Sequence, residues 1–484
     1  TDAAAKAGYD LIKKHVADLP VQGVIFTHPH GDHYGGITAM KEASSKKDFD
    51  IIAPKGFMAS AQNENVLAGV AMTRRATYMY GLQLQPGEKG TLGCGLGQRM
   101  STGSKGIARP TIEIANTGEK HTIDGVEMEF VYVLDTEAPV EIMIWLPQLK
   151  AFCTAEDMTH NMHNLQTLRG AKVRNGLLWS KAVDTAIERY GDRVEVSFST
   201  HHWPTWGNER IVDYWEAQRD MYRYLHDQTL HLANRGLTPD EIAEEMKLPA
   251  SLASQFNCRG YYGTLRHNLY FGWFDGNPAH LNPLPPSELG AKYVEAIGGA
   301  DKVLEVAKAS YAKGEYRWVA TLLDNLVFAE PENKEARQLL SDTYSQLGYQ
   351  AESGPWRNFY LTGAQDLLKK AVPYTSKLIN DGVLSQMDMG TLLDYCAIQL
   401  NGEKAGGKEA VININFTDTK EKVMLMLKNG VLNHRLGSQD KKADLTMEIA
   451  KMDFVKLFFG RTDLQTLRKT NKVKTTGDTK AIDM

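Results

Sequence analysis

The chain has 484 residues, of which 42% are hydrophobic and 24% are charged, and its formal net charge is −4. At about 100–200 residues per domain, this length corresponds to about three domains. The near-neutral charge argues against a protein that binds nucleic acid mainly through electrostatics. No run of about 18 apolar residues occurs, so we expect no membrane-spanning helix. The composition also excludes a disordered chain and a disulfide scaffold.

The first 200 residues alternate helix-like and strand-like runs. A helix is expected over 3–15, and a second one follows Gly35 and Gly36. Short β-branched or apolar runs predict strands at 21–27, 50–54, 122–133, 141–146, 151–154 and 194–199. Strands that alternate with helices predict an α/β layered sandwich.

From about residue 208 the hydrophobic period becomes helical. A long amphipathic helix is expected over 211–236, and Thr238 with Glu241 predicts a capping box at the start of the next helix. After the Pro-rich segment 282–288, the stretch 316–353 is typical of one tetratricopeptide-like helical hairpin. Its first helix is expected to bury Trp318, Leu322 and Leu326. One such unit cannot bury its own faces, so it should pack into a helical domain or a dimer interface.

The last 110 residues again contain strand-like runs. The runs at 411–416 and 423–427 predict two strands, and Asn429–Gly430 predicts the hairpin turn that follows the second. This part of the chain is expected to form a small α+β domain without an acid/base cluster.

Four cysteines lie far apart in the sequence, and none forms a CxxC pair, so a thiolate zinc site is not expected. Cys153 lies in the apolar run LKAFCTAE and is interpreted as a small core residue rather than a nucleophile.

Three imidazoles and one carboxylate lie within six residues directly after the first apolar run, in the sequence THPHGDH. They belong to His28, His30, Asp32 and His33. Neutral imidazole and carboxylate groups are the ligands that zinc and similar cations prefer. Because the chain has only 14 histidines, a chance cluster in a solvated loop is a poor explanation of this spacing.

The HxHxDH spacing resembles the signature of the metallo-β-lactamase superfamily. This resemblance implies an αβ/βα sandwich with one or two metal ions at the strand ends, and it requires further ligands from later strands. Glu137, Glu156 and His201 each follow a predicted strand, in the order that the superfamily uses.

A more specific resemblance covers nearly the whole chain. It is carried by segments such as AEDMTHNMHNLQTLRGAKVR, HHWPTWGNERIV, GWFDGNPAHLNPLPP and LGYQAESGPWRNFYLTGA, which are similar to the alkyl sulfohydrolase (alkylsulfatase) family. This resemblance implies a metallo-β-lactamase-like catalytic domain over 1–207, an α-helical dimerisation domain over 208–372 and a sterol-carrier-protein-like α+β domain over 373–484. It also implies a homodimer.

The family resemblance implies two Zn²⁺ ions per chain. His28, His30 and Glu137 would hold the first ion, Asp32, His33 and His201 the second, and Glu156 would bridge them. Asn164 and Arg169 match family positions near the sulfate group, and Arg169 offers a planar fork to a tetrahedral oxyanion. Tyr262 and His267, in RGYYGTLRHN, are weaker candidates for the catalytic site.

Two departures from the family pattern are evident. The chain begins only 27 residues before His28, so the first strands of the sandwich are expected to be missing. The segment RHNLYFGWFDGNP is also shorter than the family pattern. The Gly-rich stretch 89–103 lacks the features of a phosphate-binding loop and is expected to lie near the pocket.

The sequence therefore predicts zinc-dependent hydrolysis of alkyl sulfate esters, such as dodecyl sulfate, to an alcohol and inorganic sulfate. The alternatives are another binuclear zinc hydrolase, acting on phosphoesters, lactones or thioesters, and a lipid-binding protein with a vestigial metal site. An apolar tunnel in the last domain could hold a surfactant or fatty alcohol, or that domain could be only structural. From the family we expect a periplasmic or secreted protein, although no signal is visible in this sequence.

Overall fold

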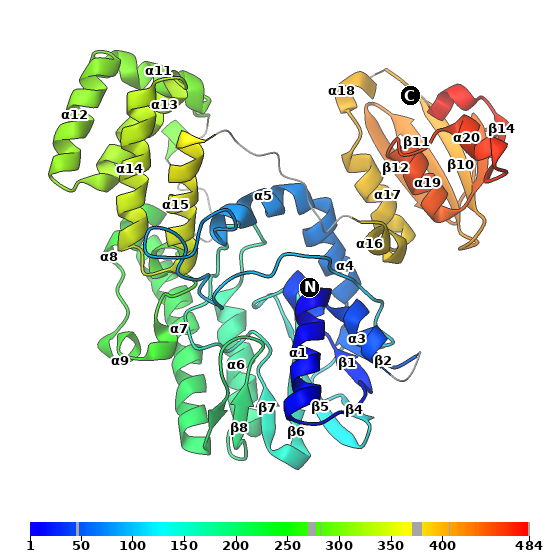
Figure 1. Ribbon diagram of the computed structural model, residues 1–484, viewed down its shortest axis with the longest axis horizontal. Helices are drawn as coiled ribbons and strands as arrows, with labels where there is room; N and C mark the ends of the chain where they lie inside the picture. Colours follow the sequence, from blue (N-terminus) through cyan, green and yellow to red (C-terminus); the bar gives the residue numbers. More distant parts are fainter. Residues whose placement is uncertain (45–47, 270–276, 281, 370–379, 406, 483–484) are drawn as a thin grey trace.

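The computed structural model describes residues 1–484 apart from 45–47, 270–276, 281, 370–379, 406 and 483–484 (Figure 1). The shortened segment noted in the sequence includes 270–276 and so lies largely outside the described residues. None of the described helices is both long enough and apolar enough to span a membrane.

Two sheets lie face to face in the first part of the chain. The smaller sheet is parallel and has the order β1-β2-β3, with the strands Gly23–Ile25, Asp50–Pro54 and Ile112–Ile114. The larger sheet has the order β4 to β9, with the strands Lys120–Ile123, Val126–Leu134, Val140–Leu146, Ala151–Cys153, Val196–Phe198 and Thr205–Trp206. Buried side chains from both sheets, including Ile52, Ile114, Phe130 and Ile142, form the core between them.

Helices cover the outer faces of both sheets. On the larger sheet, α6 (Gly176–Tyr190) and α7 (Asn208–Asn234) bury Trp179 and Trp215 against the strands. On the smaller sheet, Phe26, Tyr34 and Phe57 form a core with the neighbouring helices. The helices that contribute to this core are α2 (Gly31–Tyr34), α3 (Ile37–Ala43) and α4 (Phe57–Gln62). The helix α1 (Asp2–His15) packs against α3, and α5 (Gly69–Met79) lies outside this core. The predicted αβ/βα sandwich is confirmed.

One strand prediction was wrong in its extent. The run 122–133 is not one strand but the two antiparallel strands β4 and β5, which Asp124 and Gly125 separate. Both residues have positive φ, 50° and 80°, as a tight hairpin turn requires. The Asp-Gly pair was the sequence signal for this turn.

The direction of the strands brings the loops of the site to one edge. Because β5 pairs antiparallel with β6, β6 antiparallel with β7, and β7 parallel with β8, the strands β5, β7 and β8 all run the same way. Their carboxyl ends therefore lie at the same edge of the sheet. The three loops that begin there contain Glu137, Glu156 and His201.

The middle of the chain is helical (Figure 1). The capping box of Thr238 and Glu241 is present at the start of α8. The predicted hairpin consists of α13 and α14, but Trp318 is 50% exposed, and the buried stripe is Val319, Leu322, Leu323 and Leu326. Trp318 lies one position before this stripe and so points to the side of the helix. The helices are α8 (Pro239–Glu245), α9 (Ala250–Ala253), α10 (Leu265–Asn268), α11 (Pro286–Ile297), α12 (Ala300–Ala312), α13 (Tyr316–Ala329), α14 (Lys334–Gln350) and α15 (Gly354–Leu368).

The last part of the chain is a five-stranded sheet with helices. The strand order is β12-β11-β10-β13-β14, with the strands Val431–Leu436, Lys422–Lys428, Ala410–Phe416, Leu445–Ile449 and Val473–Gly477. The predicted turn at Asn429–Gly430 joins β11 to β12, and both residues have positive φ. The helices are α16 (Asp381–Gln386), α17 (Met389–Ile398), α18 (Gly402–Ala405), α19 (Lys451–Phe458) and α20 (Leu464–Lys469).

Candidate metal centre and substrate cavity

The loop after β1 places the first four predicted ligands. His28 lies in this loop, His30 is the N-cap of α2, and Asp32 and His33 lie within α2. The turn that follows is tightly packed, since a Cβ on Gly35 would lie 2.4 Å from the carbonyl oxygen of Gly31. A larger side chain at this position would therefore displace the ligand loop.

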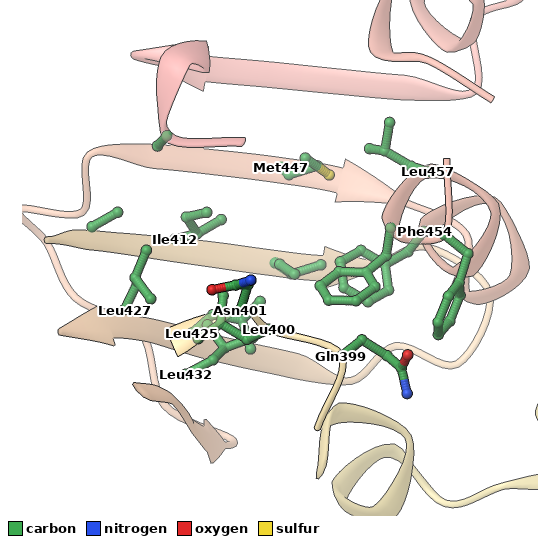
Figure 2. Close-up of a pocket in the computed structure, with 15 residues that line it drawn as sticks. Gln399, Leu400, Asn401, Ile412, Leu425, Leu427, Leu432, Met447, Phe454 and Leu457 are labelled. Atoms are coloured by element: carbon green, nitrogen blue, oxygen red, sulfur yellow. The ribbon is translucent and has the colours of Figure 1, made fainter. Parts of the chain in front are cut away.

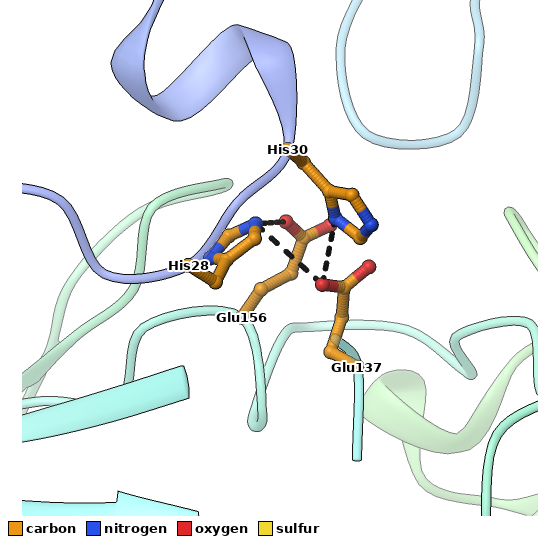
Figure 3. A group of neighbouring side chains, drawn as sticks. All are labelled: His28, His30, Glu137 and Glu156. Carbon is orange, nitrogen blue, oxygen red and sulfur yellow. Dashed lines mark ion pairs between the residues drawn. The ribbon is translucent and has the colours of Figure 1, made fainter. Parts of the chain in front are cut away.

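His28, His30, Glu137 and Glu156 form one buried group (Figure 3). Glu137 Oε2 lies 2.9 Å from His30 Nδ1 and 3.5 Å from His28 Nε2. Glu156 Oε2 lies 3.3 Å from His28 Nε2. The ligand atoms of all four residues lie within 4.8 Å of one another, which is the arrangement of a metal site.

Asp32, His33 and His201 form a second group beside the first. His33 Nε2 lies 3.2 Å from Asp32 Oδ2, and His201 Nε2 lies 3.6 Å from the same oxygen. Glu156 Oε2 is 3.0 Å from His33 Nε2 and 3.4 Å from His201 Nε2. Glu156 therefore faces both groups with a single carboxylate oxygen.

The polar atoms at the centre of the two groups fit a cation. Within the described structure, the Nε2 atoms of His28, His33 and His201 and the Oε2 atom of Glu137 are buried without a hydrogen-bond partner. Buried polar atoms without hydrogen bonds are costly, and here they lie close together. Burial and the neighbouring His33 lower the pKa of His28 to about 4. Its imidazole is therefore neutral near pH 7, in the form that binds a metal.

Four further residues hold the predicted ligands from behind. His163 Nε2 lies 3.0 Å from Glu156 Oε1, and Arg174 Nη2 donates to Glu137 Oε1 at 2.5 Å. The other ring nitrogen of His28, Nδ1, lies 3.0 Å from Thr27 Oγ1 and 3.5 Å from Glu141 Oε1. Such contacts orient metal ligands. The sequence reasoning missed these residues, although Thr27 and His163 are direct neighbours of residues that it selected.

Three non-glycine residues beside the predicted ligands have left-handed backbone conformations. Asp135, Ala155 and His202 have φ values of 54°, 51° and 68°. They lie within two residues of Glu137, Glu156 and His201. Conformations of this kind cost free energy and persist where the surrounding structure enforces them, commonly at functional sites.

A cavity of about 550 Å³ opens from the two groups. At the metal end it is lined by Asp32, Glu156, Arg169 and Tyr262, and the Tyr262 hydroxyl lies 3.0 Å from that of Tyr80. Lys105 also lines the cavity, so that its walls carry two basic side chains besides the predicted ligand His30, those of Arg169 and Lys105. The rest of the lining is mainly apolar and includes Met72, Ala76 and Leu82. Leu96 and Met100 from the Gly-rich stretch 89–103 also line it, so this stretch lies at the cavity, as expected.

Two of the predicted catalytic residues do not line this cavity in the described structure. Asn164 is buried, and Arg174 donates hydrogen bonds to its backbone oxygen and its side-chain Oδ1. His267 lies in α10, where its ring makes an edge contact with Trp356 and its backbone N–H donates to Thr264. Direct substrate contact by Asn164 or His267 is therefore not supported by the structure. Asn164 and His267 are close in sequence to Arg169 and Tyr262, which do line the cavity. Closeness in sequence therefore did not show which of these residues face the cavity and which lie behind its wall.

A second cavity, of about 350 Å³, lies in the last part of the chain, between the five-stranded sheet and its helices (Figure 2). Side chains such as Ile412, Leu425, Met447 and Phe454 line it. The only polar side chains among its described lining residues are the amides of Gln399 and Asn401. This cavity therefore suits an uncharged apolar ligand.

The sandwich and the His/Asp/Glu cluster together define a metal-dependent enzyme of the metallo-β-lactamase superfamily, and residues 1–49 match the model of that superfamily. Residues 238–370 match the family described as alkyl sulfatase dimerisation, and residues 377–484 match alkyl sulfatase C-terminal.

Similar proteins narrow this class further. The chain is 46% identical to a linear primary-alkylsulfatase of Pseudomonas sp. over 98% of this chain and 72% of that protein. It is 42% identical to the alkyl/aryl-sulfatase BDS1 of Saccharomyces cerevisiae over 99% of this chain and 75% of that protein. The solved structure of the inverting sec-alkylsulfatase Pisa1 from Pseudomonas sp. superimposes with a TM-score of 0.96 at 40% identity, over 100% of this chain and 78% of that one. The chain belongs to the alkylsulfatase family and is a sulfate ester hydrolase, as the sequence predicted.

Proposed function

We propose that this protein hydrolyses alkyl sulfate esters to an alcohol and inorganic sulfate, with two Zn²⁺ ions in its metal centre. The observation that carries the proposal is the distribution of charged and apolar side chains along the walls of the 550 Å³ cavity. One end presents a metal cluster and Arg169 to an anion, and the remainder is mainly apolar. A sulfate group with an alkyl tail has the same polarity along its length.

His28, His30 and Glu137 would hold one ion, Asp32, His33 and His201 the other, and Glu156 both. Bound zinc lowers the pKa of water and so supplies hydroxide near neutral pH. The chain's own residues have the task of placing the ester. Arg169 can bind the sulfate oxygens through its guanidinium N–H groups and offset the charge that develops as the ester bond breaks. Tyr262 and Tyr80 can donate from their hydroxyls at the same end.

The apolar lining can supply much of the substrate affinity. Burying one CH₂ group contributes about 0.8 kcal/mol, so a dodecyl chain can gain several kcal/mol along the cavity. Met72 and Ala76 from α5 and Leu96 from the Gly-rich stretch lie where this tail would run. The walls also exclude water from around the tail.

The test compares sulfate release from dodecyl sulfate with hydrolysis of a phosphodiester, a lactone and a thioester, with zinc content measured on the same sample. We expect two zinc ions per chain and turnover of dodecyl sulfate alone. Asp32→Ala and His201→Ala should each lose one zinc and most activity. Full turnover with two zincs in either variant would contradict the assignment. Hydrolysis in ¹⁸O water would show whether the label enters the alcohol or the sulfate.

A lipid-binding protein with a vestigial site is not favoured, because all seven predicted ligand positions carry ligating side chains and form two close groups. We propose that the cavity near Phe454 holds an apolar chain as an accessory to catalysis. Met447→Trp should then weaken binding of a fluorescent long-chain alcohol without changing turnover of a short alkyl sulfate.

We also propose a homodimer and the domain division 1–207, 208–372 and 373–484, in which α7, the first helix of the second domain, packs on the larger sheet of the first domain. The match of 238–370 to alkyl sulfatase dimerisation supports the dimer. Light scattering should give twice the chain mass of 53.9 kDa. A periplasmic or secreted location is proposed from the family alone, and fractionation of the source cells would test it.

A further inference from the structure

Glu64 contacts two residues of the site, the predicted metal ligand His30 and the predicted sulfate-binding residue Arg169. Its Oε1 accepts a hydrogen bond from Arg169 Nη1 at 3.1 Å, and its Oε2 lies 3.3 Å from His30 Nε2. Glu64 and Arg169 are both largely buried, with side-chain exposures of 17% and 13%. One carboxylate therefore joins a predicted metal ligand to the predicted sulfate-binding arginine.

The two nitrogens of His30 have different neighbours. His30 Nδ1 lies 2.9 Å from Glu137 Oε2, in the metal cluster, whereas Nε2 points to Glu64. A carboxylate on the outer nitrogen fixes the tautomer and the ring orientation of a metal-binding histidine and raises its basicity. Glu64 is placed to do this for His30.

Glu64 lies behind Arg169 and not beside the substrate. A smaller cavity of about 200 Å³ is lined by Glu64, and the 550 Å³ cavity is lined by Arg169, while His30, Met72 and Glu137 line both. Only Nη1 of Arg169 makes a hydrogen bond to a described residue, namely Glu64. The rest of the guanidinium is left to face the cavity.

The local backbone explains how Glu64 reaches this place. It lies in η1 (Asn63–Leu67), a turn of π-helix directly after α4. Single π-helical turns shift the direction of side chains and occur frequently at functional sites. Asn65 in the same turn donates to the backbone oxygens of Ala61, at 2.9 Å, and of Pro29 in the ligand loop, at 3.5 Å. The turn is thus attached to the loop that contains His28 and His30.

We propose that Glu64 is a positioning residue that holds His30 and Arg169 in one fixed relation, so that the metal centre and the sulfate-binding group are set together. This inference rests on the proposed function. Neither Gln nor Asp can replace Glu64 fully. Gln has one acceptor oxygen for two donors, and Asp keeps the charge but is shorter by one CH₂ group.

The activity test is a double-mutant cycle of Glu64→Gln and Arg169→Ala, measured as kcat/KM for dodecyl sulfate with zinc in excess. We expect Glu64→Gln alone to lower kcat/KM by about 10–100-fold. When Arg169 is already Ala, Glu64→Gln should lower kcat/KM by less than about threefold, because the effects of substituting residues that act as a unit are not additive. Equal losses in both backgrounds would overturn the proposal.

The metal test does not depend on activity. Competition with a chromophoric chelator should show a zinc Kd raised about 10-fold or more by Glu64→Gln, with or without Arg169. An unchanged Kd would overturn the proposal. Glu64→Asp should also show the lower kcat/KM and the raised zinc Kd. If Glu64→Asp had wild-type values of both, only the charge of Glu64 would matter, and the proposal would be overturned.

Two controls keep the outcomes distinct. Glu195→Gln makes the same chemical change in the exposed ion pair with Lys150 and should match the wild type in both assays. Thermal unfolding shows that each variant is folded. If the wild type releases no sulfate from dodecyl sulfate, the proposed function fails, while the zinc competition still tests the contact between Glu64 and His30.

Discussion

Arg174 and Glu137 form an ion pair of 2.5 Å in which both side chains are almost completely buried. The arginine occupies Glu137 Oε1, so only Oε2 is left to face His28 and His30. The orientation of a predicted metal ligand therefore depends on a residue that is not itself a ligand.

Replacing Arg174 by Ala should weaken both folding and metal binding. Breaking a buried ion pair from one side costs about 3–5 kcal/mol, because the remaining charge is left without a partner. The loss of an orienting contact should also raise the zinc Kd about 10–100-fold. Thermal unfolding and chelator competition measure the two effects. Arg210→Ala removes an exposed arginine from α7 and is the control. Wild-type values for Arg174→Ala would contradict this account.

Removing the metal should lower the thermal midpoint of the protein. Four atoms at the centre of the cluster have no hydrogen-bond partner among the described residues, so the site without metal leaves them buried without hydrogen bonds. A ligand present at about 1,000 times its Kd stabilises the native state by about 4 kcal/mol. Calorimetry before and after dialysis against a chelator should show this loss, and added zinc should restore it. An unchanged midpoint would mean that the cluster holds no metal.

Replacing Ala76 by Phe should shorten the alkyl chain that the enzyme accepts. Ala76 lines the cavity from α5, and a ring at this position would occupy the path of the tail. Each CH₂ group kept out of the cavity loses about 0.8 kcal/mol, so excluding two of them costs about tenfold in kcat/KM. The measurement is a series from hexyl to dodecyl sulfate. Ala71→Phe, on the exposed side of the same helix, should leave the series unchanged. An unaltered profile for Ala76→Phe would place the tail elsewhere.

The four cysteines should not react in the native protein. All are buried and free, and burial raises the pKa of Cys153 to about 11 and that of Cys258 and Cys396 to about 12. A raised thiol pKa keeps the unreactive protonated form at pH 8. A colorimetric thiol reagent should label none of them at pH 8 until guanidinium unfolds the chain, and enzymatic activity should survive the reagent. Fast labelling of the native protein would contradict the burial of these residues.

The sequence by itself determined which residues bring the chemistry and in which order the elements follow. The HxHxDH run can be found from its spacing. The choice of Glu137, Glu156 and His201 after three later strands came from the resemblance to the metallo-β-lactamase superfamily. Strands that run the same way end at one edge of a sheet, and this is why such distant residues come together. The capping box at Thr238 and the turn at Asn429–Gly430 are local interactions between near neighbours, and such features can be predicted without a fold.

Only the tertiary structure decided which residues support the ligands and which face the cavity. Glu64, His163 and Arg174 are ordinary polar residues in the sequence, and they act through contacts with residues 7 to 105 positions away. Asn164 and Arg169 lie in one motif, yet Asn164 packs against Arg174 while Arg169 faces the cavity. In a helix or strand, the repeat of the backbone predicts which side chains share a face, but an irregular loop has no such repeat. There the direction of a side chain is set by the buried charges and hydrogen bonds that the whole fold brings together.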